Sequence, residues 1–315
     1  MKKTVYILTM LLLVTLGFQS CEDLEEVNAP NFEVTFNATA KVGEPVQFTV
    51  NNAPNFLYFY AGDFQHQYKF RDRTNADGTV TMSFLNSQKW GLGANATGNL
   101  SLVYSKDYDG SGTVEGVNSA TWVDISDRFN ISTLYDFTLQ ESGVVDITDL
   151  ADGNSIYFGF KYFCDVTATR PSEWYIDDLN IQMDVADAPA PLTVATESDP
   201  GFKTVDAQGV VSGWNANKWY WDSGKGTNGL WRMRGQVKVG GEWIVNEDWL
   251  ITGAINLTKV SPDKGEPLKT YSEKLKTFEY IYTKAGTYTI TFIGNNETIH
   301  GQQEKVQEYT ITVTD

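Results

Sequence analysis

Tryptophan side chains are concentrated in one stretch of this chain. Six of the nine tryptophans fall between residues 214 and 249, and flat aromatic rings of this kind can stack on the apolar faces of sugar rings. The candidate glycan-binding residues are Trp219, Tyr220, Trp221, Trp231 and Trp243. Tryptophan also fills the cores of β-sandwiches, and Trp214 and Trp249 are expected to do so. The sequence leaves open whether the cluster forms an exposed platform or a core.

A second group of residues has the oxygen-rich pattern that calcium prefers. Asp107, Asp109 and Ser111 occupy alternate positions and are followed by Gly112, which is how the first half of a calcium loop begins. The loop follows a predicted strand, and Asn118 stands where a glutamate ligand would be expected. A simple acidic turn is therefore the alternative.

Asp178, in an Asp-Asp pair within a predicted strand, is a second and separate candidate calcium ligand. A structural Ca²⁺ ion is the cofactor that these residues would imply.

Motifs for catalysis are not found in the sequence. It has two histidines, His66 and His300, and Cys164 follows two aromatic residues, as a buried and inert thiol would. The chain contains no Gly-x-Ser-x-Gly, phosphate-binding or His-Glu-x-x-His motif. A glycoside hydrolase needs only two carboxylates, and 40 acidic residues are available. The sequence therefore favours a non-catalytic protein, with glycoside hydrolysis as a less favoured alternative.

The composition limits the partners of the chain. The formal net charge is −16 and the sequence pI is about 4.5, so phosphate backbones are repelled and no nucleic-acid partner is expected. A chain of 315 residues with 41% hydrophobic residues is long enough for about two domains.

The first residues read as a secretory signal. Two lysines precede an apolar stretch at 5–18, which is too short to span a bilayer as a helix. Cys21 follows Ser20 at the end of this stretch and resembles the cleavage site of a bacterial lipoprotein. That resemblance implies a signal peptide at 1–20 and lipidation of Cys21; ordinary signal cleavage, with an incidental cysteine, is the alternative.

The acidic residues after Cys21 are expected to form a tether over residues 21–31. A cluster at this position resembles the signal that sends Bacteroidetes-type lipoproteins to the outer face of the outer membrane. The resemblance implies an outer-membrane protein that faces the cell exterior and contacts the membrane only through its lipid anchor, with attachment on the periplasmic side as the alternative.

Short runs with a period of two predict an all-β chain. Apolar residues alternate with polar ones at 32–36 and 46–50, and again at 288–292 and 309–313. Phe56–Tyr60 is a continuous apolar run, expected to be a strand buried on both faces. Each end of the chain is too small to close a core alone, so residues 32–72 and 276–315 are expected to form one sandwich.

The elements KVGEPVQFTV near the start and AGTYTITF near the end resemble the two halves of a PKD-type, immunoglobulin-like sandwich. Residues 73–275 are then an inserted domain. Its predicted strands at 100–105, 120–125, 155–163 and 174–183 resemble the jelly-roll modules of adhesins and carbohydrate-binding proteins. Ala186–Pro191 is expected to be a linker within it.

The leader, these two elements, NEDWLIT and the segment PDKG together resemble a Bacteroidetes outer-membrane lipoprotein family of unassigned function. Many surface lipoproteins of this type accompany polysaccharide-uptake systems. The expectation is a surface lipoprotein that binds a polysaccharide or oligosaccharide for such a system. The alternative is a surface adhesin or structural protein that binds a protein partner.

Overall fold

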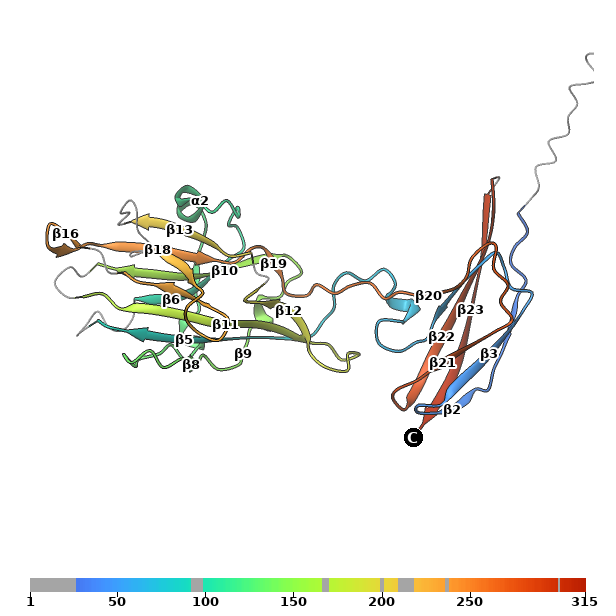
Figure 1. Ribbon diagram of the computed structural model, residues 1–315. Helices are drawn as coiled ribbons and strands as arrows, with labels where there is room; N and C mark the ends of the chain where they lie inside the picture. The colour runs from blue at the N-terminus through green and yellow to red at the C-terminus, as the bar shows by residue number, and fades with distance from the viewer. Residues whose placement is uncertain are drawn as a thin grey trace, which may run out of the picture. The chain divides into compact units, whose positions relative to one another are not determined.

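The computed structural model describes residues 27–91, 99–165, 170–198, 201–208, 218–235, 238–299 and 301–315. The chain forms two compact units (Figure 1). The terminal unit consists of residues up to Asp72 together with Pro262–Asp315, and the inserted unit consists of Arg73–Ser261.

The terminal unit has two sheets. A three-stranded sheet has the order β1-β3-β21, and a five-stranded sheet has the order β2-β23-β22-β4-β20. The strands are β1 (Glu33–Thr35), β2 (Thr39–Lys41), β3 (Pro45–Asn51), β4 (Phe56–Tyr60), β20 (Glu266–Lys269), β21 (Thr277–Ile281), β22 (Gly286–Thr298) and β23 (Gly301–Thr314). A short 3-10 helix, η1 (Tyr68–Phe70), follows β4.

The core of the terminal unit lies between its two sheets. Phe48 of the smaller sheet contacts Phe59 and Phe292 of the larger one, with ring centroids 5.3 and 5.9 Å apart. The long β22–β23 hairpin pairs from Gly286 opposite Val313 to Thr298 opposite Gly301, and β4 pairs with β22. Strands from both ends of the chain are therefore needed to build one sandwich.

Two sequence predictions about this unit are wrong. Strand β4 is not buried on both faces, because Leu57 and Phe59 point into the core whereas Tyr58 is exposed. The inserted unit ends at Ser261, not at 275, because β20 forms a ladder with β4 and so covers an otherwise open sheet edge.

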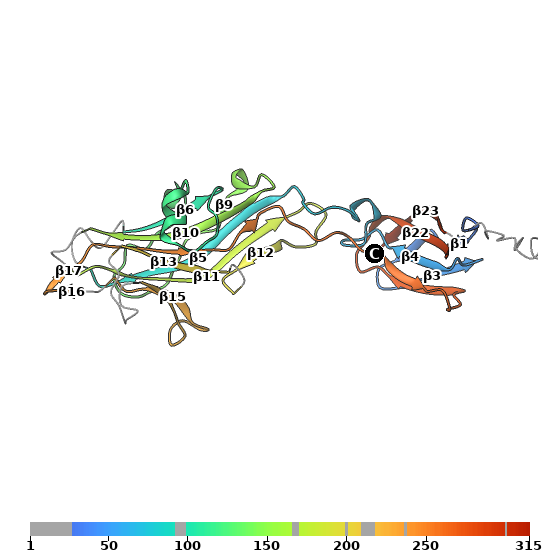
Figure 2. The ribbon, with the colours of Figure 1, turned by 90° about the horizontal axis from the view of Figure 1, so that it is seen from above.

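The inserted unit also has two main sheets (Figure 2). One has the order β13-β18-β10-β6-β7, with β19 also on β10. Its strands are β6 (Leu100–Ser105), β7 (Val123–Asp124), β10 (Ser155–Cys164), β13 (Lys203–Gln208), β18 (Asn246–Ile251) and β19 (Ile255–Asn256).

The second main sheet has the order β14-β15-β11-β5-β8, with β12 also on β11 and β9 on β5. Its strands are β5 (Thr79–Lys89), β8 (Gln140–Glu141), β9 (Val145–Asp146), β11 (Glu173–Asp184), β12 (Leu192–Thr196), β14 (Trp219–Asp222) and β15 (Leu230–Met233). A separate hairpin joins β16 (Lys238–Val239) to β17 (Glu242–Trp243).

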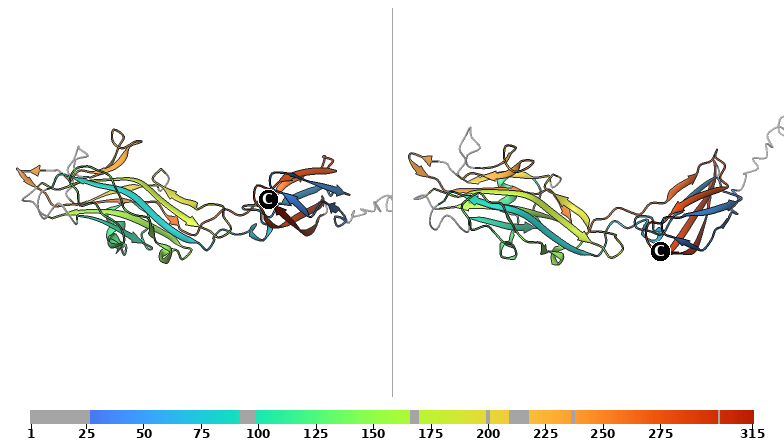
Figure 3. Two further views of the ribbon diagram at one scale, coloured as in Figure 1. Left: turned by 90° about the horizontal axis from the view of Figure 1, so that it is seen from below. Right: turned by 60° about the horizontal axis from the view of Figure 1, so that its bottom comes forward.

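Short helical segments complete the inserted unit. They are the α-helix α2 (Val114–Ser119) and the 3-10 helices η3 (Ser126–Arg128) and η4 (Thr148–Leu150). Helix α2 lies on the outer side of the β10 sheet (Figure 3), where Val117 packs with Val103 and Trp249.

The inserted unit is a sandwich whose sheets meet through aromatic side chains. Phe84 of β5 contacts Phe160 of β10 edge to face, with centroids 5.1 Å apart. With α2 the only α-helix in the described part of the chain, the prediction of an all-β protein built from sandwiches is confirmed.

Residues 186–191 do not form the linker that their alanines and prolines suggested. They lie between β11 and β12, which pair with each other in antiparallel register from Met183 opposite Leu192. The Ala188 N–H donates to the Val185 carbonyl. The segment is therefore the turn of a hairpin inside one sheet.

A carboxyl group lies inside the inserted sandwich. Asp248 of β18 is 1% exposed and accepts a hydrogen bond from the Asn246 side chain. Burial and the neighbouring Asp206, opposite it in the β13–β18 ladder, together raise the pKa of the Asp248 carboxyl to about 9. The folded state thus holds a proton on this carboxyl at neutral pH.

We predict that a chain limited to residues 73–261 folds by itself. All of the buried residues in the large core of the inserted unit come from this range. A chain without the terminal unit therefore keeps that core intact. The measurement is a thermal unfolding curve, which should be cooperative. A matched fragment of residues 27–72 should stay unfolded, because β22 and β23 supply its main sheet; cooperative unfolding of that fragment would contradict the assignment.

We predict that Asp248→Asn weakens the pH dependence of stability. The folded-state pKa lies above the ordinary value of 3.8, so this group favours the folded state at low pH. That stability is lost as pH rises toward 9, by up to about 1.4 kcal/mol per pH unit. Denaturant unfolding between pH 5 and 8 should show a smaller decrease for the variant than for the native chain. Equal decreases would show that Asp248 is not the responsible group.

Candidate binding groove

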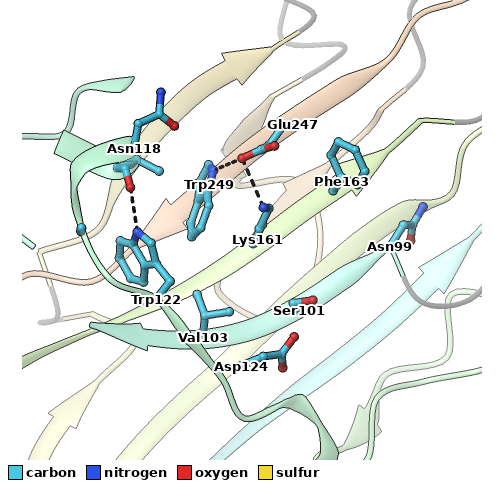
Figure 4. A pocket seen from close by; sticks show the side chains of 12 residues that line it. Asn99, Ser101, Val103, Asn118, Trp122, Asp124, Lys161, Phe163, Glu247 and Trp249 are labelled. Carbon is cyan, nitrogen blue, oxygen red and sulfur yellow. Dashed lines mark hydrogen bonds and ion pairs between the residues drawn. The ribbon is translucent and has the colours of Figure 1, made fainter. Parts of the chain in front are cut away.

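A depression on the inserted unit lies over the outer face of β6, β10 and β18. It has a volume of about 460 Å³, which is in the range of small-ligand sites. The residues that give it chemical character are Ser101, Trp122, Asp124, Lys161, Phe163 and Glu247 (Figure 4).

The floor of the groove follows from the alternation of side chains along β10. Phe160 and Tyr162 point into the sandwich and are fully buried, so Lys161 and Phe163 point outward. Phe163 is 40% exposed. An apolar ring is thus presented to solvent beside a charged side chain.

The β10–β18 ladder places four outward residues in one block. Lys161 lies opposite Trp249, and Phe163 lies opposite Glu247. The Lys161 Nζ atom lies 3.4 Å from Glu247 Oε1, and the Trp249 Nε1–H group donates to the same oxygen at 2.9 Å. The ammonium group also lies over the Trp249 ring, 5.0 Å from its centroid.

One end of the groove is closed by aromatic rings. The Trp122 and Trp249 rings lie 4.9 Å apart, and the Trp122 Nε1–H group donates to the Val117 carbonyl of α2 at 3.0 Å. Gly159, on the floor between them, has no side chain; an added Cβ atom would lie 3.4 Å from each tryptophan. The glycine leaves room for the two rings to approach.

Asp124 of β7 adds a negative charge on the side of the groove away from Glu247 of β18, with β10 and β6 between them. It lies across from Val103 in the β6–β7 ladder, and its Oδ1 atom accepts a hydrogen bond from the Ser126 N–H group. Burial favours a raised pKa, but the hydrogen bonds from Ser126 and Ser101 and the charge of Lys161 outweigh it and lower the pKa of Asp124. The carboxylate is therefore ionised at neutral pH.

The predicted calcium-loop residues form the support of α2. Asp107 Oδ1 accepts from the Ser105 hydroxyl and the Thr121 N–H group, and Asp109 Oδ1 accepts from the Ser111 N–H group. These hydrogen bonds lower the pKa of both carboxyls. Thr113 then caps α2 by accepting from the Gly116 N–H group.

Asp178 lies in the other sheet, at a bulge of β11 between Asp177 and Asn180. Its φ angle is +50°, and its N–H group donates to Glu197 Oε2. The structure does not bring Asp178 together with Asp107, Asp109 and Ser111. Among the described residues, no group of three or more His, Cys, Asp or Glu side chains is arranged to hold a metal ion.

The predicted tryptophan platform is not formed as one flat surface. Trp219 is 1% exposed and belongs to the core, so it offers no stacking face. Trp221 is 41% exposed, but its ring is inclined at 71° to that of Trp231. Trp243 lies in the separate β16–β17 hairpin, beside Lys238.

Tyr220 lies on the opposite face of β14 from Trp219 and Trp221, across from Arg232. Arg232 donates to Glu173 Oε2 at 2.7 Å and to Asp222 Oδ2 at 2.8 Å. The Tyr175 hydroxyl donates to the same Glu173 oxygen. Tyr220 therefore borders a structural ion-pair network on this face.

The structure describes two of the four remaining residues for which the sequence made a prediction, Cys164 and Trp249. Cys164 is buried, as expected. Trp249 is also buried, but it packs with Val103 and Val117 on the outer face of its sheet and not in the core between the two sheets. The lipidation residue Cys21 and the core candidate Trp214 lie outside the described residues.

The sequence analysis missed all six of these groove residues, which are Ser101, Trp122, Asp124, Lys161, Phe163 and Glu247. Lys161 and Phe163 alternate with the core residues of the predicted strand at 155–163. The period of two therefore indicated that both side chains face outward. No local pattern indicated that Glu247, far along the chain, would reach Lys161.

The fold and the groove define a β-sandwich protein with a surface groove lined by aromatic and polar side chains. The chain belongs to the family described as Domain of unknown function (DUF5017), whose model matches residues 20–202, more than half of the chain. The match includes Trp122, Lys161 and Phe163 and ends before Glu247. A search of curated proteins and a search of solved structures found no match.

None of the helices in the described ranges has the length and apolar character needed to cross a membrane.

We predict that Arg232→Met strongly destabilises the inserted unit. The Glu173 side chain is almost fully buried, and removal of one partner of a buried ion pair typically costs about 3–5 kcal/mol. Chemical denaturation measures the change. Asp222→Asn, which removes the more exposed partner, should cost roughly 1 kcal/mol or less. Similar losses for the two variants would contradict a central role for the Glu173–Arg232 pair.

Proposed function

We propose that this protein is a non-catalytic glycan-binding lipoprotein of the cell surface and that the groove over β6, β10 and β18 is its binding site. It captures a polysaccharide or oligosaccharide for an outer-membrane uptake system. It is anchored through lipid on Cys21, with the protein facing the exterior. A lipid anchor with more than one acyl chain gives stable attachment without a membrane-spanning helix.

The observation that carries the proposal is the combination of rings and hydrogen-bonding groups in one groove. Phe163 presents an apolar ring face to solvent, and Trp122 lines the same depression. Ser101, Asp124 and Glu247 line it with hydroxyl and carboxylate groups. Sugars present apolar ring faces and many hydroxyl donors, so both kinds of group in the groove have a partner on a glycan.

The leader and the acidic tether support the location. The apolar stretch at 5–18, Cys21 and the acidic residues that follow have the order expected for an exported, lipid-anchored protein. Mass spectrometry of the protein from its native membrane tests this part; the proposal requires an acylated N-terminal Cys21.

We predict that Phe163→Ala weakens glycan binding. Loss of one stacking ring should cost about 1 kcal/mol, or roughly fivefold in Kd. The measurement is calorimetry against the glycan that the native protein binds best in a panel of amylose, xyloglucan, galactomannan, polygalacturonate and chondroitin sulfate. Trp122→Ala should weaken binding at least as much, provided that its unfolding curve stays cooperative.

Trp221→Ala is the matched control, because Trp221 has nearly the same exposure as Phe163, 41% against 40%, but lies in the other sheet. It should leave the affinity unchanged. A loss confined to Trp221→Ala would move the site to the tryptophan cluster. Absence of binding to every glycan would refute glycan capture, and release of new reducing ends would refute a non-catalytic role.

A further inference from the structure

The charges that face the groove are unequal. Lys161 is the one cation among the described residues that line it, whereas Asp124 and Glu247 are anions. The whole chain is acidic as well, with a formal net charge of −16. A ligand that enters the groove therefore meets a negative potential unless Lys161 offsets it.

Lys161 has little charge to offer a ligand, because Glu247 already neutralises it. The two groups are 3.4 Å apart, and their side chains are 32% and 20% exposed. Partial burial lowers the effective dielectric around the pair, so the attraction is stronger than between two groups in open solvent. The ammonium group is also held over the Trp249 and Phe163 rings.

Glu247 is itself fixed in this position. The Trp249 Nε1–H group donates to the same Oε1 atom that faces Lys161, and Glu247 lies directly opposite Phe163 in the ladder. A carboxylate held at two points has little freedom to turn away when a ligand arrives. Both contacts favour the pairing of Glu247 with Lys161 when a ligand enters the groove.

Asp124 makes the net charge of the groove lining negative. Its pKa is lowered, so it carries its charge at neutral pH, and it is exposed at the rim of the groove. Carboxylates of this kind accept strong hydrogen bonds from hydroxyl groups. They repel carboxylates and sulfates.

We propose that the groove selects uncharged glycans and rejects uronic acid and sulfated chains, with Glu247 as the specificity-determining residue because it masks Lys161. The inference rests on the proposed function of the groove. Neutral sugars supply hydroxyl donors for Asp124 and Glu247 and an apolar face for Phe163. An anionic sugar replaces a donor with a negative charge, which the groove cannot pair while Glu247 holds Lys161.

The test compares Glu247→Gln with the native full chain. Glutamine keeps an acceptor for the Trp249 Nε1–H group but frees the Lys161 ammonium group. The native protein should bind at least one of amylose, xyloglucan and galactomannan, and should bind polygalacturonate and chondroitin sulfate at least tenfold more weakly. Glu247→Gln should gain at least tenfold in affinity for polygalacturonate, and added salt should reduce this gain.

Two controls separate the effect of Lys161 from that of net charge. Glu141→Gln removes the same charge from exposed β8 in the other sheet and should give no such gain. The double variant Glu247→Gln with Lys161→Met should lose the gain, and unfolding curves verify that each variant is folded. An equal gain for Glu141→Gln, or a gain that survives the loss of Lys161, would overturn the role of Glu247.

The failures of the two proposals are distinguishable. Native protein that binds anionic chains as well as neutral ones through the groove, as judged by Phe163→Ala, would overturn charge selection and leave glycan capture intact. Native protein that binds none of the five glycans would refute both.

Discussion

The alternation of side chains along β10 is the constraint on which both the core and the groove depend. Phe158, Phe160 and Tyr162 are fully buried in the sandwich, whereas Lys161 and Phe163 point to the other side. A shift of the ladder by one residue would exchange the two sets. The same hydrophobic burial that holds the sheets together therefore fixes the ring and the cation of the groove in place, without any dedicated loop.

This constraint explains which parts of the structure could be predicted. The period of two predicted the all-β class, and the predicted strands at 100–105 and 155–163 match β6 and β10 almost to the residue. The pairing of the chain ends, seen in β4 with β22, follows from the need to close a core.

The groove could not be predicted in the same way, because its parts meet through long-range register. Lys161 reaches Glu247 only because β18 lies next to β10, and local periodicity does not say which strands are neighbours. The prediction of an exposed tryptophan platform was wrong for a related reason. A period of two places Trp219 and Trp221 on one face of β14, but burial then divides them, with one in the core and the other exposed.

The interrupted terminal unit also sets an order of assembly. Every residue of the inserted unit is present once the ribosome has passed Ser261, whereas β1 to β4 still lack the two long strands that complete their sandwich. The middle of the polypeptide can thus acquire its native state before its beginning can. Until synthesis is finished, the apolar faces of β3 and β4 stay uncovered, and a segment of this kind is prone to aggregate or to need a chaperone.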